Sequence, residues 1–257
     1  MFYRLHRYLY QLASRGMGIR NCNFVSSGEL RVLERIVELS PLGWIVDAGA
    51  HDGAYSRAAL ALSPRLSILA VEPHPGSFAR MEKKLSPQIT MVRGALGRSS
   101  GDTQIFDRPG TNGSVWATTS GTALETLYHD DGELKKYSVA RFTLDELCER
   151  HQIPRIALLK IDVEGDELEV LEGASRLLKS CAIDAIQFEL SFYQALRGIH
   201  FADFRRQLPH FVFFRVLPAG LLSWDKIKNE DPEVLFMPQN CLAVRKDLAP
   251  LLENLLR

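Results

Sequence analysis

The stretch "IVDAGAHDGAYS", residues 45–56, decides the fold that the rest of the chain adopts. A short β-branched run ends at Asp47, Gly49 and Gly53 flank a turn, and a good helix-forming sequence follows. Glycines in such a turn let the main chain approach a ligand closely, and the N–H groups that open the helix can bind a carboxylate or phosphate. The stretch therefore predicts a strand, a turn and a helix that together form a small-molecule site.

Strand-like and helix-like runs continue to alternate along the chain. Further strand-like runs are "LSILAVEP", "ITMVRGAL", "IALLKIDVEG" and "IDAIQFEL", and helical runs such as "GSFARMEKKL", "TLDELCERHQI" and "DELEVLEGASRLLKS" lie between them. Residues 97–121, rich in Gly, Ser, Thr and Asp, are typical of loops around a hairpin. Near the end, "FVFFRVL" and "NCLAVRK" favour an antiparallel hairpin at a sheet edge.

This order of elements predicts an α/β fold, a doubly wound and mostly parallel sheet with a C-terminal antiparallel edge hairpin. Residues 1–40 are expected to form a helical segment packed on the core, and residues 41–257 the functional domain. A chain of 257 residues, 46% of them hydrophobic, can bury such a core as one unit. Because 31 basic residues balance 31 acidic ones, no overall field would hold DNA or RNA, so no nucleic-acid partner is expected.

The cysteines and the N-terminal segment indicate the compartment. Cys22, Cys148, Cys181 and Cys241 lie far apart without a CxxC pair, and are expected to be buried thiols in a reducing environment. No apolar run reaches spanning length, so a soluble, cytoplasmic protein is predicted.

Residues 1–20 have the pattern of an amphipathic helix. Phe2, Leu5, Leu9 and Leu12 follow helical spacing, and the same segment carries four arginines and no acid. We expect this helix to pack on the domain or at a homodimer contact, with its basic side in water. The alternative is weak contact with an anionic bilayer surface.

Glu72 identifies the class of ligand. It ends the second strand-like run, 25 residues after Asp47, close to where a doubly wound fold places a carboxylate for the ribose of a nucleoside cofactor. The loop between them also carries Asp52, and two carboxylates would repel the pyrophosphate of a dinucleotide. The ammonium and sulfonium of S-adenosylmethionine suit these charges better, so S-adenosylmethionine is the expected cofactor.

Three longer segments carry a family resemblance. "GWIVDAGAHDGAYS", "LAVEPHPGSFARMEKKL" and "TLDELCERHQIPRIALLKIDVEGDELEVLEGASRLL" resemble the FkbM family of S-adenosylmethionine-dependent methyltransferases, over roughly residues 26–191. The resemblance implies a Rossmann-like class I methyltransferase fold and methyl transfer to oxygen on a sugar, a glycolipid or a secondary metabolite. The positions that match its donor-binding motifs are Asp47, Gly49, Ala50, His51, Gly53, Glu72 and Asp162. One departure is His51, where members of the family commonly carry Asn.

The segment "LLKIDVEGDE" supplies the candidate catalytic groups. Oxygen methylation gains from a base near the hydroxyl, and Asp162 is the first candidate, with Glu164, His51 and Glu189 behind it. The alternative is a salt-bridged turn followed by acids that suit a helix N-terminus. Asp162 and Glu189 are too few ligands to predict a metal site, although Mg²⁺ at these strand ends would lower the pKa of the hydroxyl.

The acceptor is expected to be a small molecule or glycan, with Trp116 and Trp224 as candidate walls against a sugar face. Two rival functions remain open from the sequence. One is a nicotinamide-dependent oxidoreductase on the same fold, and the other is a non-catalytic binding protein on a degenerate methyltransferase fold.

Overall fold

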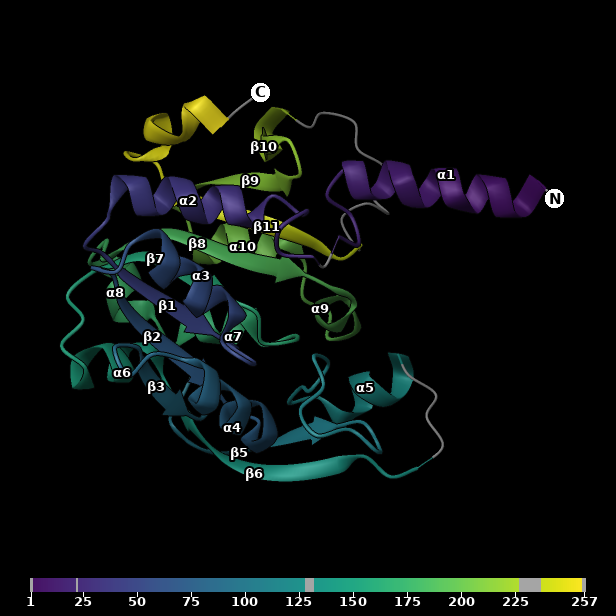
Figure 1. Cartoon of the computed structure of the whole chain (residues 1–257), viewed down its shortest axis with the longest axis horizontal. Coiled ribbons are helices and arrows are strands. Elements are labelled where there is room, and N and C mark those ends of the chain that lie inside the picture. The colour runs from purple at the N-terminus through teal and green to yellow at the C-terminus, as the bar shows by residue number, and fades with distance from the viewer. Residues whose placement is uncertain (1, 22, 128–131, 227–236, 256–257) are drawn as a thin grey trace.

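The computed structural model describes residues 2–21, 23–127, 132–226 and 237–255, and an eight-stranded sheet forms its centre (Figure 1). In spatial order the strands of this sheet are β10 (Gly220–Ser223), β9 (Phe211–Leu217), β11 (Gln239–Arg245), β8 (Ile183–Leu190), β7 (Ile156–Ile161), β1 (Trp44–Ala48), β2 (Ser67–Glu72) and β3 (Thr90–Arg93).

The pairing of the strands confirms the predicted fold class. β3, β2, β1, β7 and β8 pair in parallel, whereas β11 is antiparallel to both β8 and β9. The predicted pairing of "FVFFRVL" with "NCLAVRK" is therefore present, but these two strands do not form the edge hairpin. The short turn at Pro218 and Ala219 folds the chain back into β10, which pairs with β9 and takes the edge, while β11 lies inside the sheet.

Helices cover both faces of the sheet, as a doubly wound fold requires. On one face α2 (Glu29–Leu39), α3 (Ala54–Leu62) and α4 (Pro75–Lys84) pack against residues such as Ile45 and Leu158. On the other face α6 (Leu144–Arg150), α7 (Glu167–Glu172), α8 (Ser175–Lys179) and α10 (Phe201–Gln207) pack against residues such as Val46 and Leu159. The Thr143 hydroxyl accepts a hydrogen bond from Glu146 N at 3.1 Å and so caps α6, as the spacing of a threonine three residues before a glutamate favours.

A second, three-stranded sheet is a feature that the sequence did not predict. Its order is β4 (Ala95–Leu96), β6 (Lys135–Phe142) and β5 (Gly101–Asp107). The run "ITMVRGAL", expected to be one strand, ends in the large sheet as β3 and continues after Gly94 into this second sheet as β4. The hairpin expected within 97–121 is present only as a single antiparallel bridge between Phe106 and Thr118, because β5 forms its ladder with β6 from beyond that segment. With α5 (Gly121–Leu127), this sheet forms the lower lobe in Figure 1.

The N-terminal segment divides into two parts that behave differently. α2 packs on the core as predicted, but α1 (Phe2–Gly16) does not, since Ser14 is its only buried residue. Figure 1 shows α1 extending away from the body of the molecule. Its base is held by hydrogen bonds from Ile19 N to Ser14 O and from Arg20 N to Pro238 O, both 2.8 Å long.

The structure bears on the expected absence of a membrane span and on the expected burial of the cysteines. Among the described residues, no helix is both long enough and apolar enough to cross a membrane. Cys148 and Cys241 are buried thiols as expected, but Cys181 is exposed, and Cys22 lies outside the described residues.

The turn after β1 lies very close to strand β2 and to the segment that follows β7. Gly49 has a φ of 81°, and both Gly49 N and Ala50 N donate to Val71 O, at 2.9 and 3.0 Å. A Cβ atom at Gly49 would lie 1.8 Å from Asp162 O on the neighbouring segment. Only glycine can adopt this φ without strain and also leave room for that carbonyl. The turn therefore fixes the distance between the ends of β1 and β7.

We expect Gly49→Ala to lower the free energy of unfolding by about 2–4 kcal/mol, because a strained φ and a backbone clash act together. Urea denaturation followed by circular dichroism measures this loss. Gly16→Ala is the matched control, since a Cβ there would meet nothing within 4 Å, and it should change stability by less than about 0.5 kcal/mol. Equal small effects of both substitutions would contradict the close approach at Gly49.

Candidate functional site

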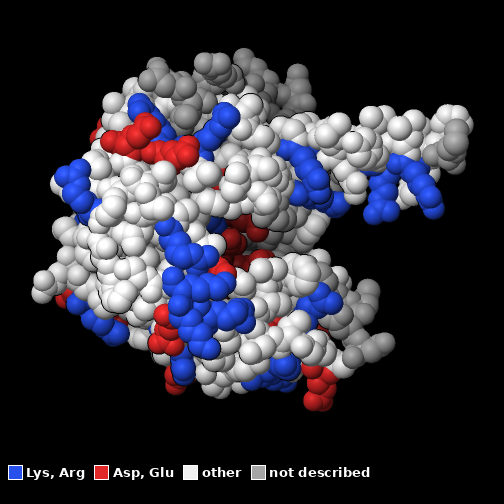
Figure 2. Space-filling model, in the orientation of Figure 1, with Lys and Arg blue, Asp and Glu red and all other residues white. Residues whose placement is uncertain are grey.

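A cavity of about 420 Å³ lies beyond the carboxyl ends of the parallel strands. One wall is formed by the ends of β1, β2, β7 and β8, and the other by the second sheet and residues 114–119. Figure 2 shows this hollow, with acidic side chains inside it. The predicted site residues that line it are Asp47, Gly49, Ala50, His51, Glu72, Asp162 and Glu164, and Glu189 lines it as well.

Gly53 is the predicted site residue that does not line the cavity. It begins α3 with a φ of 76°, and a Cβ there would lie 2.6 Å from Leu85 Cδ2. Its role is to let α3 pack closely against the residue that follows α4, while Asp52 Oδ1 accepts the N–H of Ala54 in the first turn of α3 at 3.2 Å.

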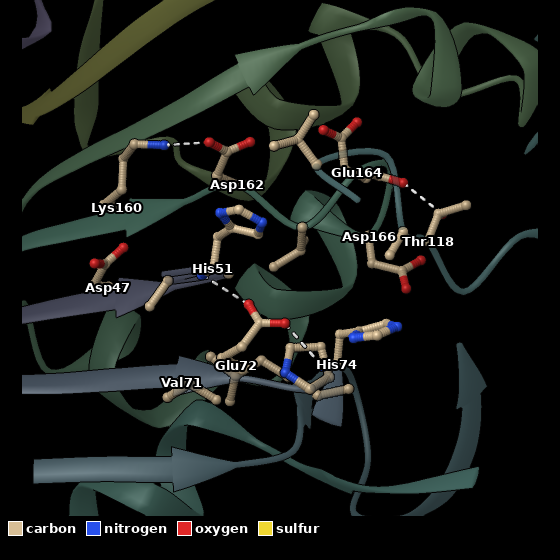
Figure 3. A pocket seen from close by; sticks show the side chains of 18 of the residues that line it. Asp47, His51, Val71, Glu72, His74, Thr118, Lys160, Asp162, Glu164 and Asp166 are labelled. Carbon is tan, nitrogen blue, oxygen red and sulfur yellow. Dashed lines mark hydrogen bonds and ion pairs between the residues drawn. The ribbon is translucent and has the colours of Figure 1, made fainter. Parts of the chain in front are cut away.

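Glu72 ends β2 as a buried carboxylate that is aimed by the main chain (Figure 3). Its Oε2 accepts the N–H of His51 and its Oε1 accepts the N–H of His74, each at 2.8 Å. Burial raises the pKa of Glu72 to about 7, although both N–H groups favour the ionised form. Each carboxylate oxygen still has acceptor capacity, so the group can accept two further hydrogen bonds from a ligand in the cavity.

The imidazole of His51 links the β1 turn to the opposite wall. Its Nε2 lies 3.2 Å from Gly113 O and 3.2 Å from a guanidinium nitrogen of Arg80, which itself donates to Gly113 O at 2.7 Å. His51 also has a φ of 50°, which is uncommon for a residue with a side chain. The imidazole of His51 therefore joins two parts of the site, and its Nε2 is already engaged by Gly113 and Arg80.

A buried charged cluster lies at the ends of β1 and β7. The Lys160 ammonium donates to Asp162 Oδ2 at 2.8 Å and lies 4.0 Å from Glu29 Oε2. Burial disfavours its charge, but Asp162 and Glu29 hold the pKa of Lys160 above its ordinary value. On the adjacent strand, burial raises the pKa of Asp47, against a 2.7 Å hydrogen bond from the Ser56 hydroxyl. Lys160 therefore stays cationic among these carboxyl groups.

Three carboxylates meet on the far side of this cluster. Asp162, Glu164 and Glu189 each offer an oxygen, and the three oxygens lie within 4.8 Å of one another. Burial and the neighbouring acids raise the pKa values of Glu164 and Glu189 well above the usual range. Glu164 has a φ of 53°, and its carbonyl accepts a 2.7 Å hydrogen bond from the Thr118 hydroxyl. Such a group can accept a proton, bind hydroxyls or ligate a hard cation.

Glu167 holds the turn that carries these acids. Its carboxylate accepts the N–H groups of Val163 and Gly165 at 3.1–3.2 Å, and the Gln194 amide also donates to it. Burial raises the pKa of Glu167 to about 7, despite those N–H groups. With 1% exposure, Glu167 supports the shape of the turn and does not contact the cavity.

The opposite wall is organised by Asp107 at the end of β5. Its carboxylate accepts the N–H groups of Arg108 and Gly113 and the hydroxyl of Ser114, and lies 3.3 Å from His74 Nε2. Burial would raise the pKa of Asp107, but these hydrogen bonds hold it below the usual value. The loop 107–114 is thus fixed against His74, two residues after Glu72.

Sequence reasoning considered Lys160 but missed its partners Glu29 and Gln187. Glu29, Lys160 and Gln187 meet across α2, β7 and β8, and the Gln187 amide donates to Glu29 Oε2 at 2.6 Å. The available signal was a polar residue inside an otherwise apolar strand, as in "AIQFEL". Of the two tryptophans that were expected to contact a sugar, Trp116 lines the cavity. Trp224 is buried against Phe201, with ring centroids 4.4 Å apart. Trp224 is therefore not a wall of this cavity.

A curated relative matches part of the chain. Over 90 residues the chain is 32% identical to the hexuronic acid methyltransferase AglP of Haloferax volcanii; the match covers 35% of this chain and 32% of that protein. The chain thus matches about a third of the length of this relative.

Two solved structures resemble the fold. The methyltransferase FkbM from Methylobacillus flagellatus KT has a TM-score of 0.47 at 12% identity, covering 82% of this chain and 47% of that one. The precorrin-6y C5,15-methyltransferase from Geobacter metallireducens GS-15 has a TM-score of 0.45 at 11% identity, covering 84% and 88%.

The match to a family model covers most of the architecture described above. The model of the methyltransferase FkbM domain matches residues 47–214, from the acid that ends β1 to the middle of β9. This range includes Glu72, the charged turn after β7 and both walls of the cavity. The resemblance inferred from the sequence is confirmed, and the chain belongs to the methyltransferase FkbM domain family.

Proposed function

We propose that this chain is an S-adenosylmethionine-dependent methyltransferase that methylates a hydroxyl group of a sugar-containing acceptor. The observation that carries the proposal is Glu72, a buried carboxylate with both oxygens aligned by main-chain N–H groups and open to the cavity. A carboxylate held in this way suits the two adjacent hydroxyls of a ribose.

The strand order supports a donor that extends across the sheet. Next to Glu72, the apolar residues Pro73, Ala95, Leu96 and Ile105 line a part of the cavity that suits a flat adenine ring. On the other side of Glu72 come β1 and then β7, with Asp47, Lys160 and Asp162. These charged groups suit the ammonium and carboxylate of an amino acid. The residues present therefore fit adenine, ribose and methionine in that order.

The same charges disfavour a dinucleotide. Its pyrophosphate would lie near the β1 turn, where Asp47 and Asp162 line the cavity and would repel it. Lys160 is already engaged by Asp162 and Glu29, so its charge is not available to offset both acids. A nicotinamide-dependent oxidoreductase is thus the weaker interpretation.

The next acids across the sheet are suited to the acceptor. The donor supplies an electrophilic methyl group on a sulfonium, and the protein has to align the acceptor hydroxyl and take its proton. Asp162 was the first candidate for this base, but Lys160 binds one of its oxygens. Burial and the neighbouring acids raise the pKa values of Glu164 and Glu189, so this pair has a higher affinity for a proton than an ordinary carboxylate. We therefore assign proton acceptance to the Glu164–Glu189 pair, and donor binding to Asp162.

A sugar acceptor is supported by two observations. The curated relative AglP methylates a hexuronic acid, as its name states. In this chain Trp116 lines the same cavity as the carboxylates and is 37% exposed, so its ring can stack on a sugar face.

Calorimetry should show that S-adenosylmethionine binds and that NAD binds more weakly or not at all. Glu72→Gln should weaken the binding of S-adenosylmethionine by about 2–4 kcal/mol, which raises its Kd roughly 30-fold to 1,000-fold. The reason is that hydrogen bonds from two ribose hydroxyls to a charged acceptor are lost. Glu82→Gln, an exposed glutamate on α4, is the matched control and should bind normally. Tighter binding of NAD than of S-adenosylmethionine would refute the methyltransferase assignment.

The pKa of Glu72 predicts opposite pH trends for binding and stability. Donor affinity should increase from about pH 6 to pH 8 as Glu72 ionises, and Glu72→Gln should flatten this increase. Without donor, the folded chain holds protons on Glu72 and Glu167 up to about pH 7, whereas these groups ionise near 4.5 when unfolded. The free energy of unfolding should therefore fall as pH rises from about 5 to 8. Thermal melts across this range measure it, and a rise would contradict the buried-carboxylate assignment.

Substitutions at the three acids should separate their roles. With a hydroxyl acceptor identified by transfer of a labelled methyl group, Glu164→Gln or Glu189→Gln should lower kcat by about 10²–10⁴ and leave the donor Kd almost unchanged. Asp162→Asn should mainly raise the donor Kd. If Asp162→Asn is the variant that loses kcat at saturating donor, and the two glutamate variants do not, Asp162 is the base. Loss of activity with a chelator, restored by Mg²⁺, would instead assign the three acids as metal ligands.

A further inference from the structure

Helix α1 presents an apolar face that no described part of the chain covers. We define this apolar face as Phe2, Leu5, Leu9 and Leu12, which follow one another at intervals of three and four residues. Each of these side chains is 50–71% exposed. At 1.5 Å per residue, the 15 residues of α1 extend over about 22 Å. A long apolar stripe of this kind is costly in water and indicates a binding surface.

The opposite face of α1 is basic. At 100° per residue, Arg4, Arg7 and Arg15 lie with Gln11 on the side away from the apolar face, and in the view of Figure 2 the basic side chains lie along the lower side of the helix. Residues 1–20 contain no acid, and Arg20 adds a fourth arginine. Because the whole chain has 31 basic and 31 acidic residues, the remainder of the chain is net acidic. Positive charge is therefore concentrated at this helix.

Only the base of α1 is attached to the domain. The chain leaves the domain at Ile19, whose bridge to Gln239 joins it beside β11, and Ser14 is the only buried residue of the helix. Nothing in the described parts of the chain depends on the apolar face, so its substitution should leave the domain folded.

The charges decide between the possible occupants of this face. A second copy pairing through Leu5, Leu9 and Leu12 would have only two heptads, fewer than the three or four that indicate a coiled coil. It would also bring arginines together with no acid to offset them. An anionic bilayer instead attracts the arginines to its headgroups while the apolar face enters the acyl boundary. Tyr8 and Tyr10 lie on the two borders between the faces, where amphipathic rings favour a membrane interface.

We propose that α1 is an interfacial membrane anchor that lies in the surface of an anionic lipid bilayer and holds the domain beside it. The binding is the sum of a hydrophobic part from the four apolar side chains and an electrostatic part from the arginines. It does not depend on the proposed methyl transfer, because no residue of α1 lines the cavity.

Co-sedimentation of the full chain with vesicles tests this proposal. The protein should bind vesicles that contain phosphatidylglycerol far better than vesicles of phosphatidylcholine alone, and the binding should decrease with added NaCl. Leu9→Ser combined with Leu12→Ser should weaken binding by at least about 30-fold. Arg4→Gln combined with Arg7→Gln should weaken it by roughly fivefold per arginine on anionic vesicles only.

The matched control is Leu42→Ser combined with Arg65→Gln, which removes one exposed apolar and one exposed basic side chain from outside α1. This control should bind as the unmodified chain does, and all variants should keep the same melting temperature. Equal binding to neutral and anionic vesicles, or undiminished binding by the leucine variant, would overturn the proposal. So would a dimer in sedimentation velocity that the leucine variant abolishes, in a chain that binds no vesicles.

Discussion

The buried ammonium of Lys160 is the interaction on which the site depends. It is 4% exposed, and three acids, Asp162, Glu29 and Asp47, are placed around it. Burying one charge in this way would cost several kcal/mol, and the neighbouring carboxylates offset that cost only while the geometry holds. Through these contacts Lys160 joins helix α2, strand β7 and the charged turn into one unit. The charge distribution at the cavity therefore depends on a buried residue, Lys160.

Around that unit the site is built from two walls of different origin. The wall at the sheet edge is rigid, because the close approach of Gly49 to Asp162 and the N–H groups bound by Glu72 and Glu167 fix its carboxylates. The other wall comes from the second sheet and is attached through several side-chain contacts, such as Thr118 with the carbonyl of Glu164 and Arg80 with the carbonyl of Gly113. Parallel strands place their ends together, so the carboxylates of the first wall converge on the cavity. In the proposed function the first wall would bind the donor.

The charge distribution of the molecule follows the same logic on a larger scale. The acids gather in the cavity, where a cationic donor would offset them, and arginines gather on α1. A net charge of zero thus hides two regions of opposite sign. Composition alone excludes a strong overall field, but it says nothing about where the charges meet.

The sequence by itself determined the features that depend on neighbours along the chain. The strand, turn and helix around Gly49, the carboxylate of Glu72 at the end of the next strand, the cap at Thr143 and the alternation of elements all follow from local pattern. These patterns were enough for the fold class, the family and most of the residues that line the cavity at the ends of β1 and β2. The local patterns did not predict the second sheet. The run "ITMVRGAL" has the pattern of one strand, but the structure divides it between the two sheets as β3 and β4.

Only the tertiary structure decided the contacts between distant segments. It paired β5 with β6, brought Glu29 to Lys160, set Glu164 against Glu189, and left α1 without a surface to cover its apolar face. An acid in a strand or an apolar stripe on a helix has the same local signature whether it meets a partner or water. Its pKa and its role depend on burial and on the charges that packing brings near it, and these arise from the whole fold.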